Sequence, residues 1–326
     1  MTGNTIKKTL PGLVLLALAC SSANAELQSR LAGQAYYDTL LDITWIADGN
    51  LVATNSFGVS GVGTSTSGFG AMTLYTAQAW IAAMNAASYL GVSDWRLTIH
   101  VDTDGPDADD LGDDGCDFAY VGTDCGWNPD PAASEIAHLY YITLGNPGSY
   151  DPDGVHQDWC DAGKPAPPAC LINVGPFRNF LPNHYWTGSD DVIDATRAWE
   201  FNARIGLLNG DYKTRLSYAW AVRDGDIDPD EDGVVTPEDN CTLVANPSQC
   251  DSDGDGYGNH CDGDMNNDSY TNAFDAPLFR ARLGQPSVAP TYSQADLNCN
   301  GFVNSFDTAL FRSLLGSPPG PSGLVP

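Results

Sequence analysis

Between Asp224 and Asp307 a side-chain oxygen recurs at every second position over several short stretches. The stretches read D-G-D-I-D-P-D-E-D-G from Asp224 and D-S-D-G-D-G-Y-G-N from Asp251. Two twelve-residue segments follow, D-M-N-N-D-S-Y-T-N-A-F-D from Asp264 and D-L-N-C-N-G-F-V-N-S-F-D from Asp296. A tight loop with oxygens at alternate residues supplies the roughly six to eight ligands that Ca²⁺ requires. The spacing therefore predicts calcium-binding loops in the C-terminal third of the chain.

The composition is strongly acidic, with 42 acids against 14 bases and a formal net charge of −28. Nucleic acid is excluded as a partner because binding phosphate requires clustered lysine and arginine. Acidity can also serve solubility alone, but solubility does not explain acids at fixed spacings. A length of 326 residues accommodates one full domain and smaller modules.

The first 25 residues have the pattern of a secretory signal peptide. Lys7 and Lys8 precede an apolar run at 13–19, and a small-x-small cleavage site ends at Ala25. The alternative is a lipoprotein acylated at Cys20. No later segment has the length and apolar character of an integral membrane span, so we expect a secreted or cell-surface protein.

Cysteine usage indicates disulfide bonds. Of nine cysteines, Cys20 lies in the signal segment and eight remain, an even number for an exported chain. Two close pairs are candidate local disulfides, Cys116 with Cys125 and Cys160 with Cys170. A second group leaves three pairings open: Cys241, Cys250, Cys261 and Cys299. Zinc binding by this group is a weaker alternative, since no C-x-x-C spacing occurs.

Residues 26–223 have the composition of a globular domain. Thr76–Leu90 is expected to be a helix capped by Thr76, with Gly91 after its end. Its apolar stripe is Ala77, Trp80, Ile81, Met84 and Ala87. A second helix is expected at 134–144, and strands at 36–47, 94–97, 184–187, 198–202 and 218–223. The fold class is therefore α+β with small antiparallel sheets and two helices.

A series of motifs in this domain carries a family resemblance: Y-D-T-L-L-D-I-T-W-I-A-D, A-Q-A-W, S-D-W-R-L, S-E-I-A-H-L-Y-Y, H-Y-W-T-G-S, R-A-W-E-F and Y-A-W-A-V-R. Over residues 30–223 the chain resembles the family named after the C-terminal domain of the Legionella collagen-like adhesin. It departs from the family pattern at Thr98 and Ile99, where the family has Pro-Thr, and its loop at 101–131 is enlarged. The resemblance implies a C-type-lectin-like fold and a glycan or cell-surface ligand. Sulfated glycans fit less well, because the domain has only nine lysines and arginines.

The segment D-N-C-T-L-V-A-N-P-S-Q-C-D-S-D-G-D-G-Y-G-N-H-C-D-G-D resembles a thrombospondin type-3 calcium repeat, and the preceding D-I-D-P-D-E-D-G-V resembles a partial copy. In such repeats bound calcium and disulfides replace a hydrophobic core. Cys250 stands where the repeat usually has another residue. The alternative is a disordered acidic linker at 224–263. The resemblance implies these ligands: Asp251, Asp253, Asp255 and Asp262, with Asp228, Asp230 and Asp232 in the partial copy.

The two twelve-residue segments start 32 residues apart, and each precedes a helix, A-P-L-F-R-A-R-L-G or T-A-L-F-R-S-L-L-G. Residues 264–316 thereby resemble a dockerin, a small α-helical pair of half EF-hands. The first set of implied ligands is Asp264, Asn266, Asp268, Tyr270 through its carbonyl, Asn272 and Asp275. The second set is Asp296, Asn298, Asn300, Phe302 through its carbonyl, Asn304 and Asp307. The first loop has one more carboxylate, so we expect tighter binding there if Ser269 permits the turn that glycine usually makes.

These modules suggest a secreted, calcium-binding adhesion or binding protein. The alternative is an assembly component whose dockerin-like part binds a cohesin-like protein, with residues 317–326 as a flexible tail. The acidic loop at 102–117 either holds another ion or is simply solvated. The five histidines show no metal-site spacing, and no G-x-S-x-G, H-E-x-x-H or phosphate loop is present. We therefore expect no enzyme, with a secreted glycoside hydrolase as the remaining alternative.

Overall fold

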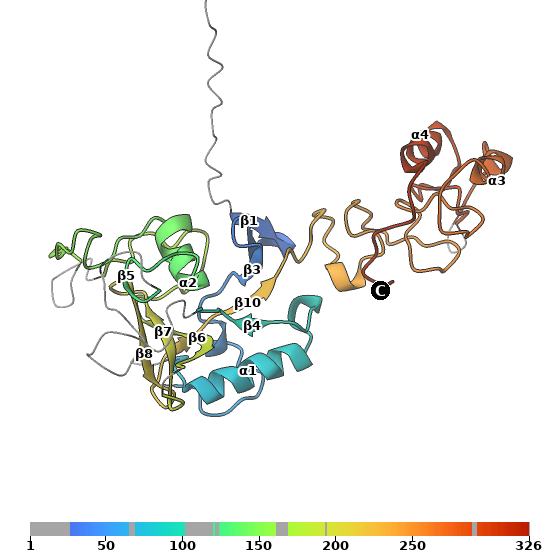
Figure 1. The fold of residues 1–326 in the computed structure, drawn as a ribbon. Coiled ribbons are helices and arrows are strands. Elements are labelled where there is room, and N and C mark those ends of the chain that lie inside the picture. The colour runs from blue at the N-terminus through green and yellow to red at the C-terminus, as the bar shows by residue number, and fades with distance from the viewer. Residues whose placement is uncertain are drawn as a thin grey trace, which may run out of the picture.

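The computed structural model describes residues 27–64, 69–101, 120, 124–160, 169–192, 194–288 and 292–325. The predicted signal peptide with Cys20, the acidic loop at 102–117 and Cys116 lie outside these ranges. Within them the protein is mixed α+β, with two small sheets and few helices (Figure 1), so the coarse α+β class is confirmed. The expectation of antiparallel sheets holds for one sheet, whereas the other contains one parallel pair.

The first sheet brings together the two ends of the N-terminal domain. Its order is β1-β2-β3-β10-β4, and every neighbouring pair is antiparallel. Its strands are β1 (Leu27–Arg30), β2 (Ala35–Asp38), β3 (Ile43–Ile46), β4 (Arg96–Leu97) and β10 (Ala221–Asp224). Because β10 pairs with β3, the chain leaves the domain beside the strands with which it entered.

The second sheet has the order β5-β8-β7-β6-β9, in which β6 and β9 are parallel and the other pairs are antiparallel. Its strands are β5 (Gly126–Trp127), β6 (His184–Asp190), β7 (Arg197–Asn202), β8 (Leu207–Tyr212) and β9 (Tyr218–Ala219). The sequence did not predict β8, whose L-L-N-G-D-Y contains residues that disfavour strands. It forms because all six of its residues pair with β7.

Helix α1 (Leu74–Ala86) buries the predicted apolar stripe except Ala87, which is exposed beyond its end, and the predicted range of 76–90 is wrong at both ends. The buried residues are Leu74, Ala77, Trp80, Ile81 and Met84. Thr73 caps the start, since its hydroxyl accepts the backbone N–H of Thr76 at 3.3 Å. The helix ends early where the Asn85 amide bonds both backbone groups of Trp95, each at 2.8 Å. The side-chain contact of Asn85 with Trp95, ten residues later, thus takes the place of the last helical turn predicted after Ala86.

The second predicted helix is present in two parts. Ser134 caps α2 (Glu135–His138), and a π-helical turn, η4 (Leu139–Thr143), follows before Gly145. The 3-10 turn η1 (Leu31–Gly33) connects β1 to β2, η2 (Leu51–Ala53) lies between β3 and α1, and η3 (Tyr89–Gly91) follows α1. The core between these elements is aromatic, and six of the eight tryptophans are buried.

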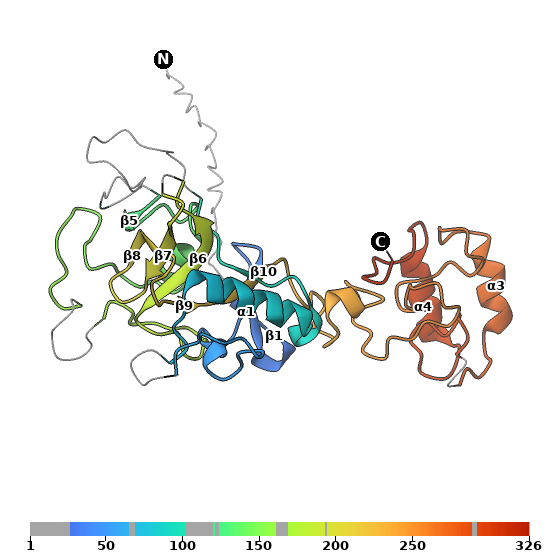
Figure 2. The same ribbon diagram turned by 90° about the horizontal axis from the view of Figure 1, so that it is seen from below.

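Residues 240–325 form a C-terminal unit in which α3 (Asp275–Arg282) and α4 (Ser305–Leu314) pack together. The Phe279 and Phe311 rings stack at 4.7 Å between them. Both views place these helices away from the two sheets, beyond the 3-10 turn η5 (Thr236–Glu238) (Figures 1 and 2).

Residues 317–325 return along this unit, whereas we expected a flexible tail. The Gly323 N–H donates to the Asp239 carbonyl at 2.8 Å, and the Gly320 N–H donates to the Cys261 carbonyl at 3.1 Å. The Ser322 hydroxyl donates to the Gly256 carbonyl at 2.7 Å. The segment has few side chains that bury apolar area, so its path depends on these backbone partners, which sequence patterns do not reveal.

Candidate metal-binding loops

Four twelve-residue segments share one register: residues 228–239, 251–262, 264–275 and 296–307, here loops 1 to 4. Each has a carboxylate or amide at its first, third and fifth residues and an aspartate at its twelfth, as an EF-hand loop does. In loops 1 and 2 these are Asp228, Asp230, Asp232 and Asp239, then Asp251, Asp253, Asp255 and Asp262. In loops 3 and 4 they are Asp264, Asn266, Asp268 and Asp275, then Asp296, Asn298, Asn300 and Asp307.

The backbone curls in the same way in all four loops. The first aspartate accepts the backbone N–H of the sixth residue in each loop. The sixth residues are left-handed: Gly233 (φ 88°), Gly256 (94°), Ser269 (73°) and Gly301 (96°). So are the fourth residues: Glu231 (62°), Gly254 (76°), Asn267 (56°) and Cys299 (48°). Ser269 therefore does adopt the turn usually made by glycine.

The twelfth aspartates are buried at the far end of each loop, with at most 1% of the residue exposed. In loop 3 the two oxygens of Asp275 accept the backbone N–H groups of Asn266 and Asn272, at 3.2 and 2.7 Å. In loop 4 Asp307 makes the equivalent bonds with Asn298 and Asn304, at 3.3 and 2.7 Å. Identical bonds at a spacing of 32 residues indicate a structural duplication.

The seventh and ninth residues of loops 3 and 4 also meet. The Asn272 amide donates to the Tyr270 carbonyl at 2.8 Å, and the Asn304 amide to the Phe302 carbonyl at 3.0 Å. Three carboxylates come within 4.8 Å of one another in loops 1 and 2, at their first, third and fifth residues. Among the described residues, no such group of three acids forms in loops 3 and 4, where asparagine replaces part of the charge.

Asp239 is the site residue that the sequence analysis missed. The resemblance to a partial copy gives loop 1 three ligands, yet Asp239 stands eleven residues after Asp228. The same spacing separates Asp264 from Asp275. Applying the twelve-residue rule to every D-x-D-x-D-G would have found it.

Loop 1 tests whether these residues fit a hard cation. Asp228, Asp230 and Asp239 each have one buried oxygen without a hydrogen-bond partner in the structure. An unpaired buried carboxylate oxygen is costly, whereas a cation satisfies several at once. Burial, together with the charge of neighbouring Asp232, raises the pKa of Asp230 to about 6. The donors are all oxygen, so the site fits Ca²⁺ better than a softer metal.

Loop 2 concentrates like charge in the same way. Burial and then the neighbouring carboxylates Asp255 and Asp253 raise the pKa of Asp262 to about 7. Burial is also the main cause of the raised pKa values of Asp253 and Asp255 themselves. Proton uptake relieves this repulsion in the absence of metal, and a divalent cation would relieve it without protons.

The cysteines resolve the pairing that the sequence left open. Cys241 bonds Cys261, and Cys250 bonds Cys299, so these four sulfurs are not zinc ligands. The predicted Cys160–Cys170 disulfide is confirmed, whereas the predicted Cys116–Cys125 pair falls partly outside the described residues. The Cys250–Cys299 bond ties the residue before loop 2 to the fourth residue of loop 4. Loops 2 and 4 are therefore covalently connected.

His184 belongs to a polar cluster of the N-terminal domain, away from loops 1 to 4. His184 contacts the buried Glu200 carboxylate at 2.6 Å, and the Ser217 hydroxyl donates to the same carboxylate at 2.7 Å. Both side chains hold Glu200 instead of contacting each other, which is not the geometry of an activated serine. This cluster joins β6, β7 and the segment before β9.

Comparison of the chain with protein-family models, with curated proteins and with solved structures finds no match. Over the described part of the chain, no helix combines the length and apolarity required to cross a membrane. The geometry of loops 1 to 4 is therefore the basis for assigning a function.

Proposed function

We propose that the protein is a secreted calcium-binding protein of the adhesion or ligand-binding type, in which Ca²⁺ organises loops 1 to 4. The observation that carries this proposal is the common register of the four loops, together with the unpaired buried oxygens of Asp228, Asp230 and Asp239. The three disulfides whose two cysteines both lie within the described residues support an extracellular setting. Each loop offers the oxygen-rich donor set that Ca²⁺ prefers.

Calorimetric titration of the full chain with Ca²⁺ tests the proposal. We expect binding heat that chelator abolishes, and Asp251→Ala and Asp264→Ala should each remove a separate binding step. Asp153→Ala is the matched control, because Asp153 is an exposed acid outside the loops. Absence of heat, or equal stoichiometry in all four proteins, would contradict calcium binding by these loops.

For the N-terminal domain we propose a lectin-like fold that binds a glycan. The mixed α+β architecture is compatible with such a fold, and an aromatic surface supports a sugar ligand. Tyr150 packs against Trp127 at 4.6 Å and His156 at 4.8 Å, and Trp159, three residues after His156 in the sequence, is 47% exposed. Glycan-array binding of the full chain should weaken in Trp159→Ala. An array without any retained glycan would count against this ligand class.

Docking to a partner protein is a second candidate, favoured by a duplicated apolar pair. Phe274 and Phe306 are the eleventh residues of loops 3 and 4, and they are 76% and 71% exposed. Exposed phenylalanines at equivalent places suit contact with a partner protein. A cohesin-like domain should retain the full chain in the presence of Ca²⁺ and lose the Phe274→Ser/Phe306→Ser double variant. Equal retention of both proteins would remove the support for docking.

A further inference from the structure

Two apolar residues, one directly before loop 1 and one within it, lie in the hydrophobic core of the N-terminal domain. Ile227 precedes the loop and is fully buried, and Val235 at its eighth residue is 7% exposed. Both belong to the same core cluster as Trp95. A Cβ on Gly91 would lie 2.7 Å from the Val235 side chain, so the domain surface is fitted closely to the loop. The expected boundary after Arg223 therefore does not coincide with the edge of this core.

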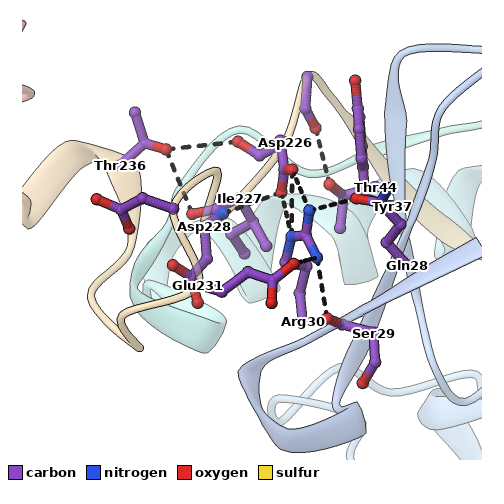
Figure 3. A network of polar contacts seen from close by, with 12 residues as sticks. Gln28, Ser29, Arg30, Tyr37, Thr44, Asp226, Ile227, Asp228, Glu231 and Thr236 are labelled. Atoms are coloured by element: carbon purple, nitrogen blue, oxygen red, sulfur yellow. Dashed lines mark hydrogen bonds and ion pairs between the residues drawn. The ribbon is translucent and has the colours of Figure 1, made fainter. Parts of the chain in front are cut away.

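Arg30 on β1 connects the first sheet to loop 1 (Figure 3). It is 4% exposed, and its guanidinium donates to both oxygens of Asp226, at 2.8 and 2.7 Å. It also donates to the Glu231 carboxylate at 3.0 Å. Asp226 in turn accepts the backbone N–H of Asp228 at 3.1 Å. The buried Arg30 guanidinium thus positions the first and fourth residues of loop 1, Asp228 and Glu231.

Loop 1 also positions the segment that follows it. Asp232 accepts the backbone N–H of Asn246 at 2.8 Å. One oxygen of Asp239 accepts the Cys241 N–H at 2.8 Å and the Gln249 amide at 2.9 Å. Three carboxylates of the loop therefore bond the protein through one oxygen and leave the other buried and unpaired: Asp228, Asp230 and Asp239. The loop is tied to both regions and keeps oxygens for a ligand.

We propose that loop 1 is a divalent-cation site at the joint between the two regions, and that its occupancy stabilises the N-terminal domain. This inference rests on the proposed calcium binding and extends it from the C-terminal unit to the domain upstream. A ligand that binds only the native state stabilises everything that folds cooperatively with its site. Ile227, Val235 and Arg30 make loop 1 part of that cooperative unit.

Tryptophan fluorescence reports on the N-terminal domain alone in the full chain, because all eight tryptophans lie between Trp45 and Trp220. We expect Ca²⁺ at about one hundred times Kd to raise the fluorescence-detected Tm by roughly 5–10 °C. Asp239→Asn should remove one ion in calorimetry and most of this shift. Asp307→Asn, the equivalent change in loop 4, should remove one ion and leave the shift in place.

A second variant tests the connection separately from the ligands. Arg30→Met keeps the loop carboxylates, so calorimetric stoichiometry should persist while the calcium-dependent Tm shift becomes smaller. If Asp239→Asn retains the full Tm shift and Asp307→Asn abolishes it, loop 1 does not stabilise the N-terminal domain, and the further inference fails. The proposed calcium binding would not be affected by that result. If the unmodified chain takes up no Ca²⁺, the proposed function itself fails. The two failures are therefore distinguishable.

Discussion

The N-terminal domain and the C-terminal unit are stabilised in different ways. The domain contains two clusters of 19 buried residues each, in which Trp220 contacts Trp45 at 5.1 Å and Phe177 at 4.8 Å. The described part of the C-terminal unit has one cluster of five buried apolar residues. A core of that size does not offset the conformational entropy of about 80 residues. The unit therefore depends on two disulfides and, we infer, on cations.

Loop 1 makes the comparison more instructive because it belongs to both regions. Its Val235 lies in one of the two large clusters of the N-terminal domain, and its carboxylates resemble those of the C-terminal loops. The proposed cation binding is thus not confined to the region that lacks a large core. The following experiments separate the two kinds of stabilisation.

Removal of Ca²⁺ should have the largest effect, and it should act mainly on the C-terminal unit. With chelator, we expect residues beyond 240 to become sensitive to protease, because like-charged carboxylates then repel one another without compensation. The N-terminal domain should stay folded below its lowered Tm. Limited proteolysis with mass mapping measures this, and equal protection with and without chelator would contradict the comparison.

Trp220→Ala should destabilise the N-terminal domain and leave the C-terminal unit unaffected. Trp220 is 1% exposed, and its loss leaves a cavity that costs about 3–5 kcal/mol of unfolding free energy in the N-terminal domain. The number of ions bound by loops 2 to 4 should not change. Urea denaturation followed by circular dichroism gives the free energy, and Phe306→Ala, at a 71% exposed position, is the control. A comparable loss of unfolding free energy in Phe306→Ala would argue against a cavity in the core as the cause.

Removal of the Cys250–Cys299 disulfide should destabilise the C-terminal unit by about 2–4 kcal/mol, because the bond spans 49 residues and restricts the unfolded chain. The Cys250→Ser/Cys299→Ser variant should also bind Ca²⁺ more weakly in loops 2 and 4. Cys160→Ser/Cys170→Ser removes the disulfide of the N-terminal domain and should leave calcium titration unchanged. Weakened Ca²⁺ binding in both variants would indicate that the loss of any disulfide has this effect, and not the loss of the Cys250–Cys299 bond in particular.

The effect of pH should reverse sign when Ca²⁺ is added. The pKa of Asp262 rises from 3.8 to about 7 on folding, so its contribution to the stability of the calcium-free protein is present below about pH 4 and lost as pH rises towards 7. Protons compete with the cation, so calcium affinity should increase over the same range. Melting with chelator and calorimetry at pH 5 and pH 8 measure the two trends. Asp262→Asn should reduce the pH dependence of the Tm measured with chelator. If this pH dependence does not change, other titratable groups cause it.

Ser269→Gly should give the smallest change, a stabilisation of loop 3 by about 1 kcal/mol. Ser269 has φ 73°, a left-handed conformation that costs residues other than glycine this much. Gly233→Ser is the reciprocal control, because the space beside Gly233 is open and only its φ of 88° opposes a side chain. The measurement is the Tm of the calcium-free protein. A destabilised Ser269→Gly would show that the serine makes a compensating contact.

The sequence predicted features that depend on neighbouring residues. Alternation between 36 and 47 corresponds to β2 and β3, and the period of 3.6 residues identified the buried face of α1. The prediction was wrong where a hydrogen bond to a residue outside the helix sets the local structure. At the end of α1, for example, the Asn85 side chain bonds the backbone of Trp95. Strand β8 was missed for the same reason, since its stability comes from pairing with β7.

The sequence by itself determined the oxygen positions of loops 1 to 4, because ligand spacing in a tight loop is set by consecutive residues. Only the tertiary structure decided which cysteines pair, that residues 317–325 contact loops 1 and 2, and that Ile227 and Val235 belong to the N-terminal core. Each of these depends on groups far apart in the chain. Their proximity follows from the folding of the whole molecule, which local spacing does not encode.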